Sequence, residues 1–140
     1  MNKLAMTVIT SVLIAGVVLT VGAVDMETIK QIESGGNPRA VGNAGEIGLY
    51  QLMPVVRKSY NQRTDHNYSR NDLFDPEINH KIADWYLHNR IPEMLRYYRI
   101  PVNTKTIIWS YNAGIGNLVN GIMPQTTKIY IERYRRLNNE

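Results

Sequence analysis

The sequence predicts a mostly α-helical domain that is preceded by an N-terminal hydrophobic segment. After residue 25, apolar residues recur at helical spacing in several segments, and residues that cap or end helices bound these segments. No run of useful length alternates between apolar and polar residues, as a half-buried strand would. With 140 residues, the chain is long enough for one domain with a modest core.

The N-terminal segment has the pattern of an export signal. Residues 4–24 carry no charge and follow Lys3, and Val21-Gly22-Ala23 has the form of a small-residue cleavage site. The apolar run is also long enough to span a bilayer. We therefore expect residues 1–24 to be a cleaved signal peptide or an N-terminal membrane anchor. Residues 25–140 would then form an exported domain, periplasmic or otherwise outside the cytoplasmic membrane.

The first half of this domain is expected to alternate between helices and loops. Asp25 can cap a first helix over residues 26–34, which a glycine pair ends. A loop rich in Gly, Asn and Pro follows, up to residue 47. A short helix is predicted over about residues 48–54, and the polar residues 61–71 are predicted to form a loop.

The middle of the domain is predicted to hold two successive helices. Asp75 is followed by a proline and an acidic residue, so it can cap a helix that continues to residue 90. The buried face of this helix is predicted from its 3.6-residue spacing to contain Ile78, Ile82, Trp85 and Tyr86. Ile91-Pro92 is expected to restart a helix that ends before Pro101.

The C-terminal part is predicted to form two more helices. Asn103 or Thr104 can cap the first of them, which ends over residues 112–116. The last helix carries Ile129, Tyr130, Arg133, Tyr134 and Leu137. We see no repeat and no linker to a second domain.

The composition excludes several classes of site. The formal net charge of +4 suits an anionic polymer, but no Lys/Arg run or nucleic-acid motif is present, so no nucleic acid is expected as a partner. Cysteine is absent, which excludes disulfides and thiolate metal sites. The three histidines, His66, His80 and His88, lack the spacing of metal ligands. We therefore expect no metal and no cofactor.

Glu33 is the most informative residue of the chain. Met26 and Ile29 precede it by seven and four residues, so all three share one face of the first helix. A charge on a core-facing stripe is costly unless it is satisfied or protonated. The helix C-terminus and an apolar surround would both raise the pKa of Glu33, as a general acid requires for glycosidic cleavage. Alternatively, Glu33 extends into solvent at a frayed helix end.

Four blocks of the sequence resemble, in order, those of the soluble lytic transglycosylase family. The first extends from Glu33-Ser34-Gly35-Gly36-Asn37-Pro38 to Gly48-Leu49-Tyr50-Gln51-Leu52-Met53-Pro54. The others are residues 72–79, Ser110-Tyr111-Asn112-Ala113-Gly114, and residues 127–131. Together they extend over most of residues 26–136. The resemblance implies a small lysozyme-like helical domain that acts on peptidoglycan glycan strands.

The resemblance also implies a mechanism with one carboxylate. Glu33 would protonate the oxygen between MurNAc and GlcNAc. It would then take a proton from the MurNAc C6 hydroxyl, which closes a 1,6-anhydro ring without water. Glycosidases usually need a second carboxylate. The other acids, such as Glu46, Asp65, Asp72 and Asp75, lie in loops or caps, and Asp75 is better explained as a cap and Asp72 as a turn residue. Glu46 is the only credible second carboxylate, and by resemblance the family does not need one at this position.

Supporting roles follow from the same resemblance. Gln51 and the main chain at Met53 correspond to groups that bind sugar hydroxyl or N-acetyl groups. Tyr111 and Tyr130 correspond to tyrosines of the cleft, one of them near the catalytic carboxyl, and the main chain around Asn112 would lie near the sugar. Spacing alone leaves open that both tyrosines are ordinary core residues.

Three positions depart from the family pattern. Gly42 stands where serine is common, which would remove a hydroxyl contact. Tyr50 stands where methionine is common, and it would add an aromatic surface for a sugar ring. Thr126 replaces a common acidic residue, which would remove a partner for a nearby base. These departures bear on subsite preference and leave Glu33 intact.

Two other functions are consistent with these residues. A goose-type lysozyme has the same fold and hydrolyses the bond with water, for which a well-placed second acid would be expected. A wall-binding or assembly protein without activity would keep the cleft and lose the acid. A bare catalytic domain of this size suits local opening of the wall for a secretion, conjugation or phage-entry machine.

Overall fold

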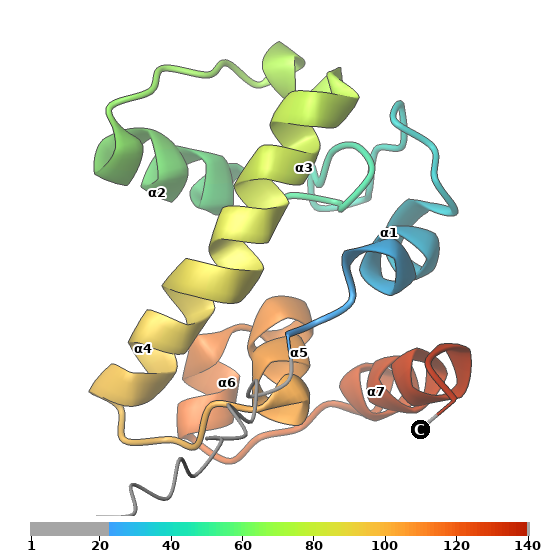
Figure 1. Ribbon diagram of the computed structural model, residues 1–140, viewed down its shortest axis with the longest axis vertical. Helices are drawn as coiled ribbons and strands as arrows, with labels where there is room; N and C mark the ends of the chain where they lie inside the picture. Colours follow the sequence, from blue (N-terminus) through green and yellow to red (C-terminus); the bar gives the residue numbers. More distant parts are fainter. Residues whose placement is uncertain (1–22, 140) are drawn as a thin grey trace, which may run out of the picture.

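The computed structural model describes residues 23–139, which form helices and no β-strand within that range (Figure 1). In order, the helices are α1 (Met26–Ser34), α2 (Pro54–Thr64), the 3-10 helix η1 (Asn71–Phe74), α3 (Pro76–Trp85), the π-helix η2 (Tyr86–Arg90), α4 (Ile91–Tyr97), α5 (Thr104–Ala113), α6 (Ile115–Val119) and α7 (Gln125–Leu137). The predicted mostly α fold is confirmed. None of these helices is long and apolar enough to cross a bilayer. The predicted signal or anchor lies outside the described residues, except for its last two.

A continuous rod made of α3, η2 and α4 crosses the molecule, with α2 beside one end and α5 and α6 beside the other (Figure 1). Its buried side chains include Ile82, Ala83, Leu87, Ile91 and Leu95. The expected new start at Ile91-Pro92 is not a break in direction. Pro92 has no N–H for the helical ladder, and the wider π turn just before it, closed from Ile91 N–H to Tyr86 C=O, continues the rod.

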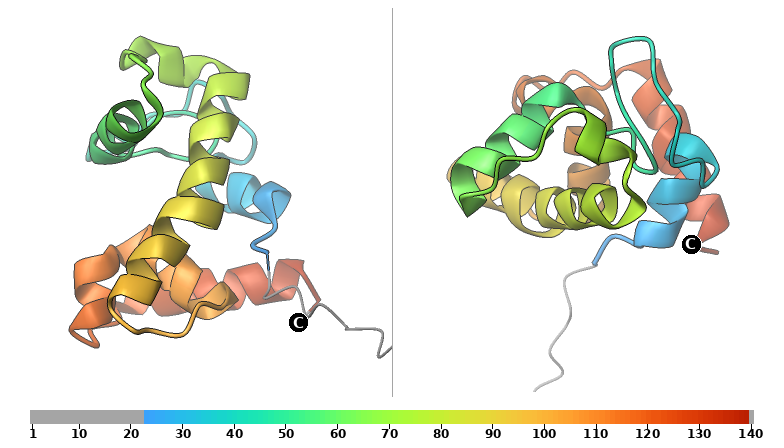
Figure 2. Two further views of the ribbon diagram at one scale, coloured as in Figure 1. Left: turned by 60° about the vertical axis from the view of Figure 1, so that its left-hand side comes forward. Right: turned by 90° about the horizontal axis from the view of Figure 1, so that it is seen from above.

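Helix α1 lies against α7, so the two ends of the described chain are side by side (Figures 1 and 2). Asp25 caps α1 as predicted, since its carboxylate accepts from Thr28 N–H at 2.8 Å. Asp25 N–H donates to the Tyr134 hydroxyl of α7 at 2.7 Å. Gly35 ends α1 in the left-handed conformation, with φ of 61°. This packing fixes where the end of α1, and therefore Glu33, lies.

The predicted short helix over residues 48–54 is wrong. Gly48 and Gln51 have φ of 80° and 46°, and Ile47 forms isolated antiparallel bridges with Val41 and Leu52, so this segment is a tight turn. Helix α2 begins only at Pro54 and extends to Thr64, into residues that were predicted to be loop. The reason is tertiary: partners from elsewhere in the chain satisfy the polar backbone groups of the turn.

The main partner of this turn is Asn79, a fully buried side chain of α3. Its amide nitrogen donates to Ile47 C=O at 2.9 Å and to Leu73 C=O at 2.8 Å. Its amide oxygen accepts from Tyr50 N–H at 3.0 Å. At Gly48 a Cβ atom would collide with the Asn79 amide, so glycine is required there for space as well as for its φ. Asn79 thereby joins the rod to the segment that leads into α2.

The first C-terminal helix begins and ends as predicted, and one additional short helix follows it. Asn103, not Thr104, caps α5, in a reciprocal capping box with Thr106. Gly114 ends α5, and the short helix α6, which was not predicted, follows at once. Helix α5 packs against α4, α6 and α7. Its last turn is thus held at the centre of the fold.

Replacement of Asn79 by alanine should destabilise the fold strongly. The variant removes the Asn79 partner of the buried Leu73 C=O and Tyr50 N–H, whereas Ile47 C=O keeps its bond from Leu52 N–H at 3.0 Å. Each buried backbone group that loses its partner costs about 1–3 kcal/mol. We expect the free energy of unfolding to fall by roughly 3 kcal/mol or more in urea titrations. Asn71→Ala, at an exposed position of η1, is the matched control and should change stability little. Equal stability of the two variants would contradict the role given to Asn79.

Candidate active site

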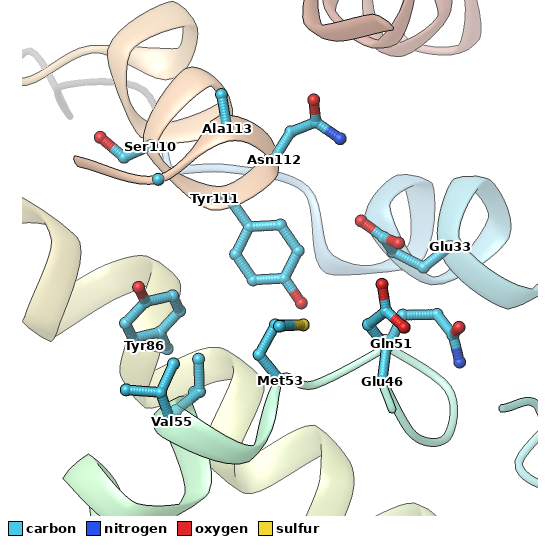
Figure 3. A pocket seen from close by; sticks show the side chains of 12 residues that line it. Glu33, Glu46, Gln51, Met53, Val55, Tyr86, Ser110, Tyr111, Asn112 and Ala113 are labelled. Carbon is cyan, nitrogen blue, oxygen red and sulfur yellow. The ribbon is translucent and has the colours of Figure 1, made fainter. Parts of the chain in front are cut away.

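A cleft of about 510 Å³ lies between the end of α5 and the segment that joins the turn to α2 (Figure 3). Its lining residues are Glu33, Glu46, Gln51, Met53, Val55, Val56, Tyr86, Ser110, Tyr111, Asn112, Ala113 and Gly114. Glu33 lies toward one end and Tyr86 toward the other (Figure 3). The structure therefore places five of the six predicted site residues around one cavity. The sixth, Tyr130, lies behind Glu33.

Glu33 is a half-buried carboxyl group at the C-terminal end of α1. Its pKa is raised from 4.5 to about 7: burial is the main cause, a hydrogen bond from Tyr130 opposes the rise, and the negative charge of Glu46 adds to it. Glu33 therefore does not extend freely into solvent. It exists as a mixture of acid and carboxylate near neutral pH, so it can both donate and accept a proton there.

Tyr130 holds Glu33 from the side of α7. Its hydroxyl donates to Glu33 Oε1 at 2.7 Å. Burial and the neighbouring Glu33 charge raise the pKa of Tyr130 well above its usual value, so the phenol stays protonated and remains a donor. The expectation that a tyrosine lies beside the key carboxyl is confirmed for Tyr130. Because α7 also packs along α1, the hydrogen bond has a fixed geometry.

Tyr111 forms part of the cleft wall on α5. Its hydroxyl donates to Tyr50 C=O at 2.5 Å, which ties α5 to the turn opposite. The ring also lies 6.0 Å from that of Tyr86, measured between centroids. Tyr111 is therefore neither a simple core residue nor a partner of Glu33. It sets the spacing of the two walls and lines the cavity.

Gln51 and Asn112 present amide groups on opposite walls. The Gln51 amide nitrogen donates to Ala40 C=O at 3.2 Å and to Gly48 C=O at 3.0 Å, so it also closes its own loop. The Asn112 carbonyl oxygen accepts from the buried Thr127 hydroxyl at 2.6 Å. These bonds fix both side chains in place. Sugar binding by Gln51, Met53 and Asn112 stays a prediction.

Two departures from the family pattern have a structural explanation. Tyr50 is fully buried, and its hydroxyl pairs with His80 Nδ1 at 2.7 Å. The expectation that its ring offers a surface to a sugar is therefore wrong, because the ring fills the core beneath the turn. At Gly42, a Cβ atom would collide with the Glu46 carboxyl group. Glycine at this position leaves room for Glu46.

Several wall residues were not identified as site residues from the sequence. Val55 and Val56 of α2 and Ser110 of α5 line the cavity, and Tyr86 forms its far end. From the sequence, Tyr86 is predicted only as a member of the buried face of its helix. The incorrect short helix concealed Val55 and Val56, because α2 has to begin at Pro54 for them to face α5.

The stability of the protein should depend on pH through Glu33. Its pKa is about 7 in the folded protein, whereas a free glutamate side chain has a pKa of 4.5. Between these values the folded state binds more protons than the unfolded state, so the free energy of unfolding falls as the pH rises. Glu33→Gln lacks this titration. From pH 4.5 to pH 8, we expect Glu33→Gln to gain roughly 1–3 kcal/mol relative to the wild type.

Urea unfolding at a series of pH values measures this difference. Glu132→Gln, at an exposed position of α7, is the matched control and should follow the wild type at every pH. A constant difference between Glu33→Gln and the wild type over this range would show that burial does not raise the Glu33 pKa.

The comparison with known proteins agrees with this geometry. The family model described as "Transglycosylase SLT domain" matches residues 24–133, which include every helix up to the middle of α7. No solved structure matched the chain. The matched region contains Glu33, both walls of the cleft and Tyr130. The chain therefore belongs to the transglycosylase SLT family, with a small lysozyme-like helical domain of the kind that acts on peptidoglycan.

Proposed function

We propose that the protein is a lytic transglycosylase that cleaves the MurNAc–GlcNAc bond of peptidoglycan and leaves 1,6-anhydro-MurNAc ends. The observation that carries this proposal is the half-buried Glu33, whose pKa of about 7 and hydrogen bond to Tyr130 suit one group that gives and then takes a proton. Membership of the family supports the substrate class.

In the first step, protonated Glu33 acts as the general acid. It donates its proton to the glycosidic oxygen while the bond from MurNAc C1 to that oxygen breaks, which releases GlcNAc with a free hydroxyl. With a pKa of about 7, a large share of Glu33 carries the required proton at neutral pH. The charge that develops on MurNAc faces the carboxylate that has just formed, which stabilises it.

In the second step, the Glu33 carboxylate acts as the base. It takes the proton of the MurNAc C6 hydroxyl as O6 forms a bond to C1, which closes the anhydro ring and restores the acid. The Tyr130 hydroxyl donates to the carboxyl group throughout and stabilises its charged form between the steps. The cycle consumes no water and needs no second carboxylate.

The walls of the cleft suit a glycan strand. Apolar surface at Met53 and Val55 faces α5 across the cavity, and amide groups at Gln51 and Asn112 stand on either side. Flat apolar surface with a few fixed polar groups is typical of sites that bind small ligands such as sugars. We propose that Gln51, Met53, Tyr111 and Asn112 contact the sugars, and that Tyr130 acts through Glu33.

We further propose that the enzyme works outside the cytoplasmic membrane. The uncharged residues 4–24 after Lys3 support export, as a cleaved signal or as an anchor. We propose local opening of the wall as its task, with a secretion, conjugation or phage-entry machine as the setting.

Digestion of purified peptidoglycan by the full chain tests the proposed reaction. We expect anhydro ends, which are lighter than hydrated ends by one water, about 18 Da, because no water enters the bond. Glu33→Gln keeps the size and hydrogen bonding of the side chain but cannot cycle a proton. It should lose at least about 100-fold in rate while the fold is retained. Mass spectrometry of the released fragments gives both results.

Glu132→Gln is the control for the same chemical change at an exposed site, and it should cleave like the wild type. If Glu33→Gln releases anhydro ends at the wild-type rate, Glu33 is not the acid. If a folded wild type releases no fragments, the domain binds the wall without cleaving it.

A further inference from the structure

We propose that Glu46 is a second catalytic carboxylate that activates water in the same cleft, so that part of the turnover is hydrolysis and leaves reducing MurNAc ends. This inference rests on the proposed function, because it concerns the same bond and the same acid. It adds an activity that a mechanism with one carboxylate does not provide.

The first observation is the position of Glu46. It lines the same cavity as Glu33 although it comes from a different segment, the loop between α1 and α2. Its carboxyl group is directed toward that of Glu33, beside Gln51 (Figure 3). The two groups are close enough for the charge of Glu46 to raise the pKa of Glu33. Two carboxyl groups that flank one cavity form the arrangement used by glycosidases that activate water.

The second observation is that the loop holds Glu46 in place. Glu46 Oε2 accepts from Ala44 N–H at 2.9 Å, and the backbone closes the loop from Gly42 N–H to Glu46 C=O at 2.8 Å. One carboxylate oxygen is thus anchored, and the other is available as a base. A long glutamate side chain on an open loop would otherwise sample many rotamers.

The third observation is the space that Gly42 provides. A Cβ atom at Gly42 would collide with the carboxyl oxygen and carbon of Glu46. Gly42 is not among the glycines with a left-handed φ, so its backbone does not require glycine. The closest contacts of such a Cβ atom are with the Glu46 carboxyl group, and Gln51 Oε1 would lie 3.0 Å away, so glycine leaves room mainly for Glu46. Residues 42 and 46 therefore form one unit that brings a carboxylate to the cleft.

The alternative is that Glu46 only closes its own loop. The bond to Ala44 N–H needs an acceptor, and a neutral amide oxygen would serve equally well. The charge and basicity of Glu46 are not needed for that task. Glu46→Gln therefore separates the two roles, since it keeps the acceptor for Ala44 and removes the base.

Glu33 gives its proton to the glycosidic oxygen as the bond from MurNAc C1 to that oxygen breaks. A water oxygen forms the new bond to C1, and Glu46 takes a proton from this water. The product carries a hydroxyl group at C1, and the proton on Glu46 returns to Glu33 directly or through solvent. One water is consumed, and the C6 hydroxyl competes with this water for the same carbon.

The test counts both kinds of new ends that the full chain makes on purified peptidoglycan. Borohydride reduces the reducing ends of hydrolysis and leaves anhydro ends unchanged, so mass spectrometry distinguishes them. A digest with Glu33→Gln gives the background. We expect the wild type to produce both ends above this background, and Glu46→Gln to lower the ratio of hydrated to anhydro ends at least tenfold. Glu132→Gln, an exposed glutamate on α7, should keep the wild-type ratio.

A second variant tests the role of Glu46 without replacing Glu46 itself. Gly42→Ala should displace the carboxyl group and lower the ratio in a chain that has Glu46. In a chain with Glu46→Ala, the collision with the carboxyl group is gone and only the Gln51 amide oxygen, at 3.0 Å, lies near the added methyl group, so the same substitution should leave the ratio unchanged. If Gly42→Ala changes the ratio of hydrated to anhydro ends equally in both backgrounds, Gly42 acts without Glu46. This result would contradict the proposal that the two residues act together.

The outcomes distinguish this inference from the proposed function. Anhydro ends alone from the wild type, or a ratio that Glu46→Gln does not change, would overturn the role of Glu46 and leave the transglycosylase proposal standing. Hydrated ends alone that disappear in Glu46→Gln would support Glu46 as the base and overturn the anhydro reaction.

Discussion

The carboxyl group that we propose as catalytic has to be withdrawn from water without losing its last hydrogen-bond partner, and the contact between α1 and α7 meets both conditions. Packing of α7 along α1 buries the end of α1, which raises the pKa of Glu33. The same contact brings the Tyr130 hydroxyl to within 2.7 Å of Glu33 Oε1. Burial without this bond would favour the neutral acid too strongly for it to release its proton. The rest of the site is built around this balance.

The wall of the cleft that is formed by the turn and α2 depends on a buried polar side chain that is not itself part of the proposed site. Asn79 satisfies the backbone of a turn that no repeating structure satisfies, and α2 starts from that turn. The Tyr111 hydroxyl then bonds the turn to α5 across the cavity. Because both contacts are buried or half-buried hydrogen bonds, they hold the walls at one separation. The geometry of the cleft in this small domain therefore rests on few polar contacts, each with a specific partner.

What could be predicted from the sequence was mostly local. The caps at Asp25 and Asp75 follow from neighbouring residues, and Glu33 follows from its helix face and the family motif. The turn before α2, in which Gln51 has a left-handed φ, could not be predicted, because Asn79 and Tyr111, which satisfy its backbone, are distant in the chain. The burial of Tyr50 likewise depends on contacts with distant segments of the chain, which the local sequence does not reveal. Its aromatic ring suggested a sugar platform, but the three-dimensional contacts place it in the core.

The central claim is that Glu33 is a carboxyl group with a pKa near neutrality, opposed by Tyr130. Carbon NMR of the glutamate side-chain carboxyl groups, assigned to Glu33 by its loss in Glu33→Gln, measures this pKa directly. The account predicts a midpoint at about 7 in the wild type. In Tyr130→Phe the midpoint should rise, because the lost hydrogen bond favours the charged form. A midpoint near 4.5 in the wild type, or one that falls in Tyr130→Phe, would contradict the account.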